Sequence, residues 1–409
     1  MTNRVVITGY GVVSAIGNSA DEFWESLKSG KTGIGPITKF DAEATGISVA
    51  AEVKDFPFSK YFEKKEARRM DLFSQYAVYA ALDGLEMSGI TQENTDFDRL
   101  GCIMGSGIGG LEQSQINSQK LLQGPRKVSP LYVPLAIANM AAGNIALRTG
   151  ARGVSRAEVT ACAAGANAIG SAFREIKFGY ADAVIAGGAE DAICELGIAG
   201  FANLTALTKE TDPAKACIPF DKNRSGFVMG AGAGVLILES LEHAQERGAA
   251  ILAELVGYGC NNDAFHMTTP SAGGIGAQKA MRLALDEAGV SAEQIDYINA
   301  HGTSTHANEE SEAAAIHAVF GDKVPVSSTK ALHGHALGAA GGIEAVATLQ
   351  AILHQYVPVN AGTTEIDQDM TINVVLEHGY EAPVEYAVSQ DFGFGGHNAV
   401  LIFKKWTGE

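Results

Sequence analysis

One thiol and two imidazoles in this sequence have the chemistry of an acyl-transfer site. Cys162 lies in the stretch TACAAG, His301 in NAHGTST and His335 in KALHGHALG. A cysteine thiolate attacks a thioester and holds the acyl group as a new thioester. Imidazole N–H groups donate hydrogen bonds to an oxygen that gains negative charge, such as the enolate oxygen of a thioester that has lost CO2. Together these side chains would suit acyl transfer followed by carbanion formation.

Each of these side chains also has a plainer interpretation. A cysteine among small apolar residues is commonly buried and inert, and a lone histidine is commonly a hydrogen-bonded polar residue. We expect Cys162 at the first turn of a helix, where unpaired N–H groups and the helix dipole lower the pKa of a thiol. This stretch alone leaves both the nucleophile and the inert cysteine open.

A lysine and a glutamate near His335 are further candidates. Lys330 would supply positive charge and a hydrogen bond if it is buried beside the histidines. Glu344 falls in an otherwise apolar helix, so its carboxylate needs a partner. We expect Lys330 to be that partner.

The elements around these residues favour one shared site. Residues 159–173 carry no charge, and the small residues after Cys162 recur at helical spacing, which predicts a buried helix. A second charge-poor helix is expected at Ala336–Leu353, after a strand at Val324–Ser328. The three candidates and Phe394 each follow a predicted strand, and sites of α/β folds form at the carboxyl ends of strands.

The chain divides into two similar halves. RVVITGYG near the N-terminus is echoed by ILAELVGYG from Ile251, which predicts halves at 1–250 and 251–409. Strands alternating with helices predict two parallel-rich sheets covered by helices. We also expect one long helical segment at Phe62–Met87 and a final strand that runs through the Gly-rich stretch at 391–398 into Val400–Phe403.

Composition excludes several classes of protein. The 409 residues carry a net charge of −17, which argues against general nucleic-acid binding, and no apolar run is long enough for a membrane span. Five scattered cysteines without CxxC pairs argue against zinc and disulfides and for the reducing cytoplasm. The glycines near Gly9 and Gly105 match neither the dinucleotide fingerprint nor a phosphate-binding P-loop.

A basic cluster is out of character in so acidic a chain. Lys64, Lys65, Arg68 and Arg69 are spaced three and four apart, as on one helix face. The cluster is either an ordinary solvated face or a dock for an acidic partner.

Four motifs together resemble those of one enzyme family. TACAAG, NAHGTST, SSTKALHGHALGAAGG and DFGFGGHN look like the β-ketoacyl-[acyl carrier protein] synthases, in particular the elongating type II enzymes of bacterial fatty acid synthesis. The resemblance covers nearly the whole chain. It implies a homodimeric thiolase fold, with duplicated halves in a layered αβαβα arrangement, and no cofactor, because substrates ride on the phosphopantetheine of acyl carrier protein. The implied reaction condenses malonyl carrier protein with an acyl-Cys162 thioester, giving 3-oxoacyl carrier protein and CO2.

The resemblance also implies residue roles. Cys162 would be the nucleophile, while His301 and His335 would promote decarboxylation and stabilise the enolate. Phe394 would gate the site, and its N–H would form the oxyanion hole with that of Cys162. Lys330 and Glu344 would support the site. The pantetheine arm would bind Thr303 and Thr305. The acyl pocket would be lined by Ile108, Tyr132 (across the dimer), Gly197, Phe201 and Leu337. Carrier protein would dock on Lys64, Lys65, Arg68, Arg69, Arg126, Lys127 and Lys209.

The chain departs from the family pattern at several positions. His333 replaces a usual Thr, Ala336 a Leu, Ala231 a Glu, Ser171 an Asp, and Gln390-Asp391 an Asn-Ser pair. None is expected to touch the catalytic groups. We hypothesise that His333 and Ala336 reshape the acyl pocket, which would suit a synthase dedicated to unsaturated or specialised acyl chains.

Three rival classes are less consistent with the motifs. Thiolases use a second cysteine near the C-terminal Gly-rich loop, and no cysteine follows Cys260. Initiating synthases carry Asn where His335 stands. Non-catalytic partner subunits that shape chain length lose the nucleophile, which this chain keeps as Cys162.

Overall fold

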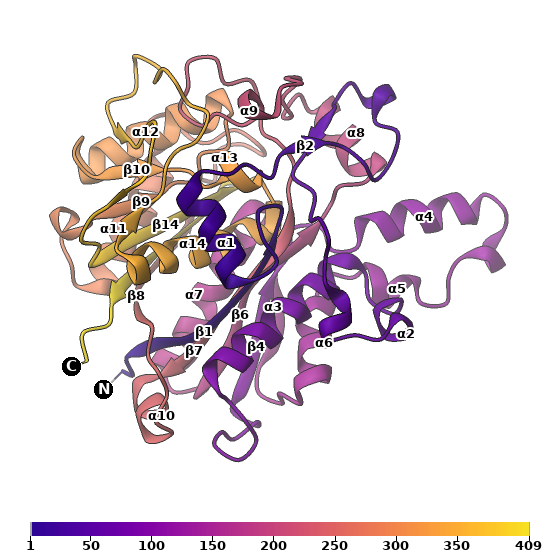
Figure 1. The fold of residues 1–409 in the computed structure, drawn as a ribbon, viewed down its shortest axis with the longest axis horizontal. Coiled ribbons are helices and arrows are strands. Elements are labelled where there is room, and N and C mark those ends of the chain that lie inside the picture. The colour runs from indigo at the N-terminus through magenta and orange to yellow at the C-terminus, as the bar shows by residue number, and fades with distance from the viewer. Residues whose placement is uncertain (1, 409) are drawn as a thin grey trace.

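A central sheet of eleven strands organises the molecule (Figure 1). The structure, a computed structural model, describes residues 2–408. One half of the sheet contains, in spatial order, β5 (Ser155–Glu158), β4 (Leu100–Gly105), β6 (Ala183–Asp191), β7 (Ala231–Ser240) and β1 (Val5–Ser14). The other half contains β8 (Ala253–Asn262), β15 (His397–Lys405), β14 (Tyr386–Gly393), β9 (Tyr297–Asn299), β10 (Pro325–Ser327) and β12 (Asn373–Val374).

The two halves repeat one topology. In the first, β5, β4 and β6 are parallel, and β7 and β1 follow antiparallel. In the second, β10, β9 and β14 are parallel, and β15 and β8 follow antiparallel. The halves join where β1 pairs with β8, the two strands that carry the echoed motif. The predicted pair of parallel-rich sheets is therefore wrong: each half is mixed, and hydrogen bonds run across the join. The boundary at residues 250 and 251 stays a prediction.

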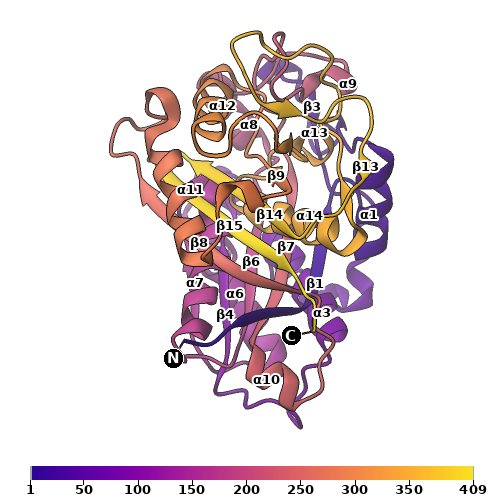
Figure 2. The same ribbon diagram turned by 90° about the vertical axis from the view of Figure 1, so that its left-hand side faces the viewer.

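Helices complete a layered αβαβα arrangement. α7 (Ala164–Lys177) and α14 (Ala340–His354) pack on each other and contact strands of both halves. α3 (Leu72–Ser88) covers the outer face of the first half. α11 (Ile275–Ala288) packs on β8 and β15 of the second half, with α12 (His306–Phe320) against it (Figure 2).

Small residues let α7 and α14 approach backbone to backbone. A Cβ added at Gly165 would lie 2.7 Å from the Gly342 nitrogen, and one at Gly341 would lie 2.4 Å from the Ala166 nitrogen. Real Cβ atoms do not tolerate such distances, so glycine is required at both positions. The small residues in the first turns of these helices thus bring their N-terminal ends, and the residues just before them, together.

Two predicted elements are wrong. The segment Phe62–Met87 is not one helix, because α2 (Lys64–Ala67) ends before Asp71, whose carboxylate caps α3 by accepting from the Phe73 N–H at 3.2 Å. The expected single final strand is a hairpin of β14 and β15, whose turn uses Gly395 and Gly396 at positive φ.

The remaining elements surround this core. They are α1 (Ala20–Ser29), α4 (Leu111–Leu121), α5 (Tyr132–Ala136), α6 (Met140–Thr149), α8 (Glu195–Asn203), α9 (Pro213–Ala216), α10 (Leu241–Glu246), α13 (Lys330–His333), and the pairs β2 (Gly35–Pro36) with β3 (Val49–Ala50) and β11 (Tyr356–Val357) with β13 (Tyr380–Glu381). Among residues 2–408, no helix combines the length and apolarity needed to cross a bilayer.

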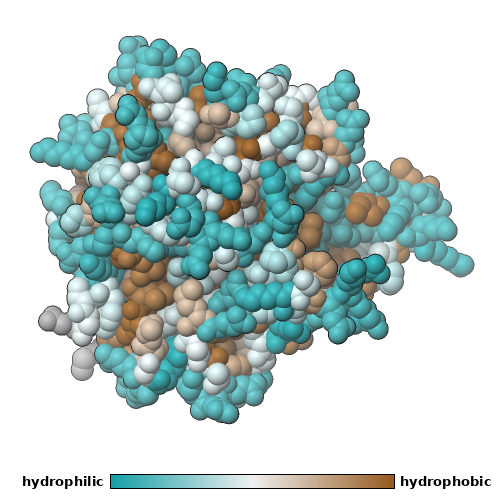
Figure 3. Space-filling view, viewed as in Figure 1, coloured by the Kyte–Doolittle hydropathy of each residue, from teal (hydrophilic) through white to brown (hydrophobic). Residues whose placement is uncertain are grey.

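An arm made of α4 and the loop that follows it projects from the body (Figure 1). Apolar side chains are exposed on the arm and on the adjoining α5 segment: Leu121, Leu122, Leu131, Val133 and Ile137. Figure 3 shows brown apolar residues on this otherwise hydrophilic arm. Among residues 2–408, strand β5 is the last strand of the sheet on this side and leaves one sheet edge unpaired.

Candidate active site

Cys162 sits in a tight turn between β5 and the central helix α7. The turn is a 3-10 segment, Ala161–Ala163, so Cys162 lies just before α7 rather than inside its first turn as expected. Ala161 holds a positive φ of 51°, a conformation that costs a non-glycine residue free energy. The cysteine is buried, with 8% of its surface exposed.

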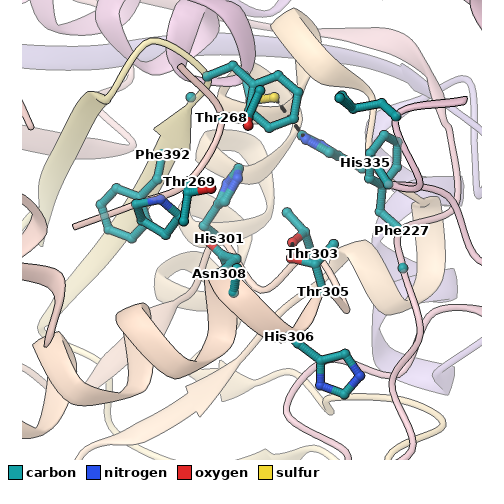
Figure 4. Close-up of a pocket in the computed structure, with 18 of the residues that line it drawn as sticks. Phe227, Thr268, Thr269, His301, Thr303, Thr305, His306, Asn308, His335 and Phe392 are labelled. Carbon is teal, nitrogen blue, oxygen red and sulfur yellow. Dashed lines mark hydrogen bonds between the residues drawn. The ribbon is translucent and has the colours of Figure 1, made fainter. Parts of the chain in front are cut away.

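The two predicted histidines meet this cysteine. His335 Nε2 lies 3.0 Å from Cys162 Sγ, and the rings of His301 and His335 are perpendicular, with centroids 5.3 Å apart. Figure 4 shows both rings on the wall of one pocket, with a dashed line joining His335 to the sulfur. The convergence predicted from their positions after strands is confirmed.

The pKa of the Cys162 thiol beside His335 differs from the expectation. Burial raises the pKa of the Cys162 thiol to about 12, although the Lys330 charge and the Phe394 N–H act in the opposite direction. Burial and Lys330 also hold the pKa of His335 well below its usual range. The prediction of a lowered thiol pKa is therefore wrong, because desolvation outweighs the Lys330 charge and the Phe394 N–H. At rest the pair is neutral, with the thiol and Nε2 within hydrogen-bond distance of each other.

A fully buried cluster of charged groups lies behind His301. The Lys330 ammonium pairs with Glu344, as expected, and lies 3.3 Å from His301 Nδ1. Asp391 Oδ1 lies 3.3 Å from the same Nδ1 and 3.9 Å from Lys330 Nζ. Burial raises the pKa of Glu344 well above its usual value. Burial disfavours the ionised form of Asp391, yet its contacts with His301 and Lys330 lower its pKa overall.

We expected that none of the residues that differ from the family pattern would touch a catalytic candidate. Asp391 contacts His301, so this expectation is wrong. The sequence signal was available: Asp391 is the lone acidic residue of the strand segment YAVSQDFG, directly before a Gly-rich turn. A buried charge requires a partner. Its neighbour Gln390 donates to Glu312 at 2.7 Å, and the Glu312 carboxylate accepts from the His301 backbone N–H at 2.7 Å. Glu312, which the sequence reasoning missed, thus anchors the His301 loop.

The acidic groups of this cluster do not form a metal site. Ligand atoms of His301, Glu344 and Asp391 lie within 4.8 Å of one another. The Lys330 ammonium, however, contacts all of these groups and supplies the positive charge at their centre. A metal cation in the same place would be repelled by it.

The pocket has a volume of about 400 Å³ and contains most of the predicted substrate contacts. Phe394, Thr303, Thr305, Phe201 and Leu337 line it together with Cys162 and both histidines. The Thr303 and Thr305 hydroxyls are 2.9 Å apart, and the Phe201 and Phe394 ring centroids are 6.5 Å apart. Ile108, Tyr132 and Gly197 lie outside this pocket, and their roles stay predictions.

Two other departures are buried away from the pocket. His333 Nε2 lies 3.0 Å from the Thr329 hydroxyl, and burial lowers the pKa of His333 to about 3. Ala336 is fully buried in the core. Neither side chain lines the pocket, so the hypothesis that they reshape it directly is not supported.

The predicted docking residues are all exposed. Lys64 and Lys65 lie on α2, Arg68 and Arg69 follow it, Arg126 and Lys127 lie on the turn after α4, and Lys209 lies beyond α8. Within residues 2–408, none of these side chains has an ion-pair partner within 4.0 Å. Since α2 is a single helical turn, the cluster is a turn and loop and not the predicted helix face.

Comparison with known proteins identifies the class. The family model "Beta-ketoacyl synthase, N-terminal domain" matches residues 2–244, and "Beta-ketoacyl synthase, C-terminal domain" matches residues 252–364. The chain belongs to the β-ketoacyl synthase family, and its layered architecture is the thiolase fold that the sequence predicted.

Individual relatives match over nearly their full length. The chain is 45% identical over 407 residues to 3-oxoacyl-[acyl-carrier-protein] synthase 2 of Staphylococcus aureus (strain N315), covering 98% of each chain. It is 46% identical over 408 residues to the protein of the same name from a Synechocystis species, again covering 98% of each. Among solved structures, the ishigamide ketosynthase/chain length factor matches with a TM-score of 0.94 at 36% identity over 100% of both chains. A β-ketoacyl synthase from Burkholderia phymatum matches with a TM-score of 0.92 at 34% identity, over 99% of this chain and 100% of that one.

Proposed function

We propose that this chain is an elongating 3-oxoacyl-[acyl carrier protein] synthase. It joins an acyl group to the two-carbon unit of malonyl-[acyl carrier protein] with loss of CO2. The observation that carries this proposal is the 3.0 Å contact between Cys162 Sγ and His335 Nε2, in a pocket that His301 also lines. A thiol, its proton acceptor and a second imidazole are the groups that both half-reactions require.

In the first half-reaction, the acyl group moves from carrier protein to Cys162. The thiol proton passes to His335 Nε2, the sulfur attacks the acyl carbonyl, and the carrier-protein thiol leaves with that proton. The backbone N–H groups of Cys162 and Phe394 form the oxyanion hole for the tetrahedral intermediate. Gly393 keeps the two segments close, since a Cβ there would lie 3.2 Å from the Cys162 nitrogen.

In the second half-reaction, malonyl carrier protein loses CO2. His301 and His335 face the thioester oxygen as it becomes an enolate, and a hydrogen bond from the ring that has taken up a proton at Nε2 lowers the barrier to decarboxylation. The carbanion attacks acyl-Cys162, the new carbon–carbon bond forms and the cysteine sulfur leaves. The condensation consumes one proton overall, because the malonyl group reacts as a carboxylate. This proton restores the Cys162 thiol.

The other pocket residues bind substrate. The Thr303 and Thr305 hydroxyls hold the pantetheine arm, and Phe394 moves aside when an acyl chain enters. Ile108, Gly197, Phe201 and Leu337 line the acyl chain, and Tyr132 contributes from a second copy of the chain. No cofactor takes part, because carrier protein holds both substrates.

Two partners follow from this function. Acyl carrier protein, which is acidic, docks on the basic residues around α2 and on the turn after α4, and a solved neighbour is titled as a ketosynthase in complex with its acyl carrier protein. A second copy of the chain covers the apolar arm and the open edge at β5, giving a homodimer. The enzyme acts in the cytoplasm.

A second candidate is condensation of specialised acyl chains. Three of the solved neighbours are titled as ketosynthases of type II polyketide or chain-length-factor systems. Asp391 is one of the positions at which this chain departs from the family pattern, and its Oδ1 lies 3.3 Å from Nδ1 of the catalytic candidate His301.

A condensation assay tests both candidates. Malonyl carrier protein is supplied with saturated, cis-unsaturated and polyene acyl carrier proteins of graded length, and 3-oxoacyl products are measured by mass spectrometry. The elongating synthase gives products from saturated chains, and the specialised enzyme gives them only from the others. No product from any chain with wild-type protein, or the same product from Cys162→Ala, contradicts the proposed function.

A further inference from the structure

The Asp391 carboxylate lies at the back of the active site, on β14. It is fully buried. Oδ1 lies 3.3 Å from His301 Nδ1, and no side-chain partner is found for Oδ2 among residues 2–408. Asp391 also contacts the central helix, since a Cβ added at Gly341 would lie 2.8 Å from Oδ2. The position of this carboxylate is therefore fixed by packing on two sides.

Two groups compete for His301 Nδ1. Lys330 Nζ and Asp391 Oδ1 each lie 3.3 Å from it. If Lys330 donates, Nδ1 accepts and the proton of the neutral ring sits on Nε2. If Asp391 accepts, Nδ1 carries the proton and Nε2 presents a lone pair.

The other partners available to Lys330 and to Asp391 decide which of them hydrogen-bonds to His301 Nδ1. Lys330 already pairs with Glu344, so its ammonium does not depend on His301. Among residues 2–408, Asp391 Oδ1 has no hydrogen-bond donor other than the His301 ring, because Lys330 Nζ is 3.9 Å away; Glu344, whose pKa burial raises well above its usual value, also interacts with the Asp391 carboxylate. A buried carboxylate without a donor is costly. The arrangement that satisfies both charged groups is therefore Lys330 on Glu344 and the His301 Nδ1–H on Asp391.

We propose that Asp391 is a positioning residue that holds the proton of His301 on Nδ1 and makes Nε2 the atom that takes up the proton consumed in condensation. The inference rests on the proposed function. Burial and Lys330 lower the pKa of His301, so the ring is neutral at rest and takes this proton from water as the malonyl group reacts. The protonated ring then donates Nδ1–H to Asp391 and Nε2–H to the thioester oxygen during decarboxylation. A charged donor makes a stronger hydrogen bond to the developing oxyanion than a neutral one. When the Cys162 sulfur leaves, the proton passes to it through His335, whose Nε2 lies 3.0 Å from the sulfur.

The charged and titratable groups that face His301 come from several elements. They are Asp391 on β14, Lys330 on α13, Glu344 on α14, Glu312 on α12 and the ring of His335. Of these, only Asp391 offers an acceptor to Nδ1 within hydrogen-bond distance.

The test compares Asp391→Asn with Asp296→Asn. Asp296 also supports β14, accepting from the backbone N–H groups of Glu385 and Tyr386, but at the far end of the strand. Acylation of Cys162 is followed by intact mass, and decarboxylation of malonyl carrier protein by released CO2. In Asp391→Asn we expect decarboxylation to fall about 10- to 100-fold, the range for a lost hydrogen bond to a charged group. We expect acylation to stay within about twofold of wild type. Asp296→Asn should change neither step.

A spectroscopic readout addresses the tautomer directly. In protein labelled with 15N-histidine, the His301 signals, assigned by their loss in His301→Gln, should show a protonated Nδ1 and an unprotonated Nε2 in wild type. The pattern should reverse in Asp391→Asn. Asp391→Ser serves if the asparagine variant does not fold.

Three results overturn the inference: an Nε2–H tautomer in wild type, equal loss of both partial reactions in a folded Asp391 variant, or unchanged decarboxylation in that variant. Wild-type protein that makes no 3-oxoacyl product would instead overturn the proposed function itself.

Discussion

The Cys162 thiol depends on its neighbour for reactivity. Burial raises the pKa of this thiol to about 12, and only the thiolate is a good nucleophile. His335 Nε2, 3.0 Å from the sulfur, is placed to accept the proton. The reactive species is therefore the pair and not the cysteine alone, and a probe of thiol reactivity should report on the histidine.

Replacing His335 by glutamine should slow alkylation of Cys162. An amide cannot take up the thiol proton, so we expect the rate with iodoacetamide to fall about 100-fold. Peptide mass spectrometry measures the modified fraction over time. Cys260 is partly exposed and should react at an unchanged rate in the same sample. Labelling of Cys162 at the wild-type rate would show that His335 does not activate it.

The sequence predicted the catalytic candidates but not the buried residue Asp391 that contacts His301 and Lys330. Cys162, His301 and His335 were predictable because each follows a strand, and strands of such folds end at one edge. The thiol pKa was predicted with the wrong sign, because a helix position says nothing about how deeply the sulfur is buried. Asp391 was missed because its partners Lys330 and His301 come from segments far away in the sequence.

The central helices show what spacing of small residues can and cannot predict. The two charge-poor helices were correctly expected to be buried, and α7 and α14 pack on each other and on both halves of the sheet. The register between them was not predictable, because it depends on which glycines face each other. Breaks in other elements were also missed: the cap at Asp71 ends the predicted long helix, and a Gly-Gly turn splits the final strand.

Replacing Gly165 by alanine should therefore destabilise the protein and the site together. The new Cβ would lie 2.7 Å from the Gly342 backbone, and such overpacking costs about 1–3 kcal/mol. Gly200 is the matched control on α8, because no heavy atom lies within 4 Å of a Cβ added there. Gly200→Ala should instead stabilise the helix by about 0.5–1 kcal/mol.

Chemical denaturation measures both effects, and Cys162 acylation reports on the site. Gly165→Ala should lower the unfolding midpoint and slow acylation, since α7 follows Cys162 directly. An unfolding midpoint equal to that of wild type would mean that the two helices do not need the backbone contact.

At the scale of the whole molecule, charge and apolar surface are unevenly distributed. The net charge is −17, yet four exposed basic residues around α2 form a local basic surface. Within residues 2–408 these four have no ion-pair partner: Lys64, Lys65, Arg68 and Arg69. An acidic partner would be repelled by the whole protein and attracted by this surface alone. Association should therefore depend on local charge and on ionic strength.

Arg68→Glu tests whether this surface receives carrier protein. Reversing one charge at the rim of the surface should raise KM for acyl carrier protein substrates about 10-fold, chiefly through slower association, and weaken its dependence on salt. Reaction with an acyl-pantetheine thioester, which lacks the protein part, should be unchanged. Lys323→Glu makes the same change in net charge at an exposed position beside β10 and should leave both substrates unaffected. If Arg68→Glu reduces turnover of the small thioester as much as that of the carrier-protein substrate, Arg68 acts on the active site itself and the docking surface lies elsewhere.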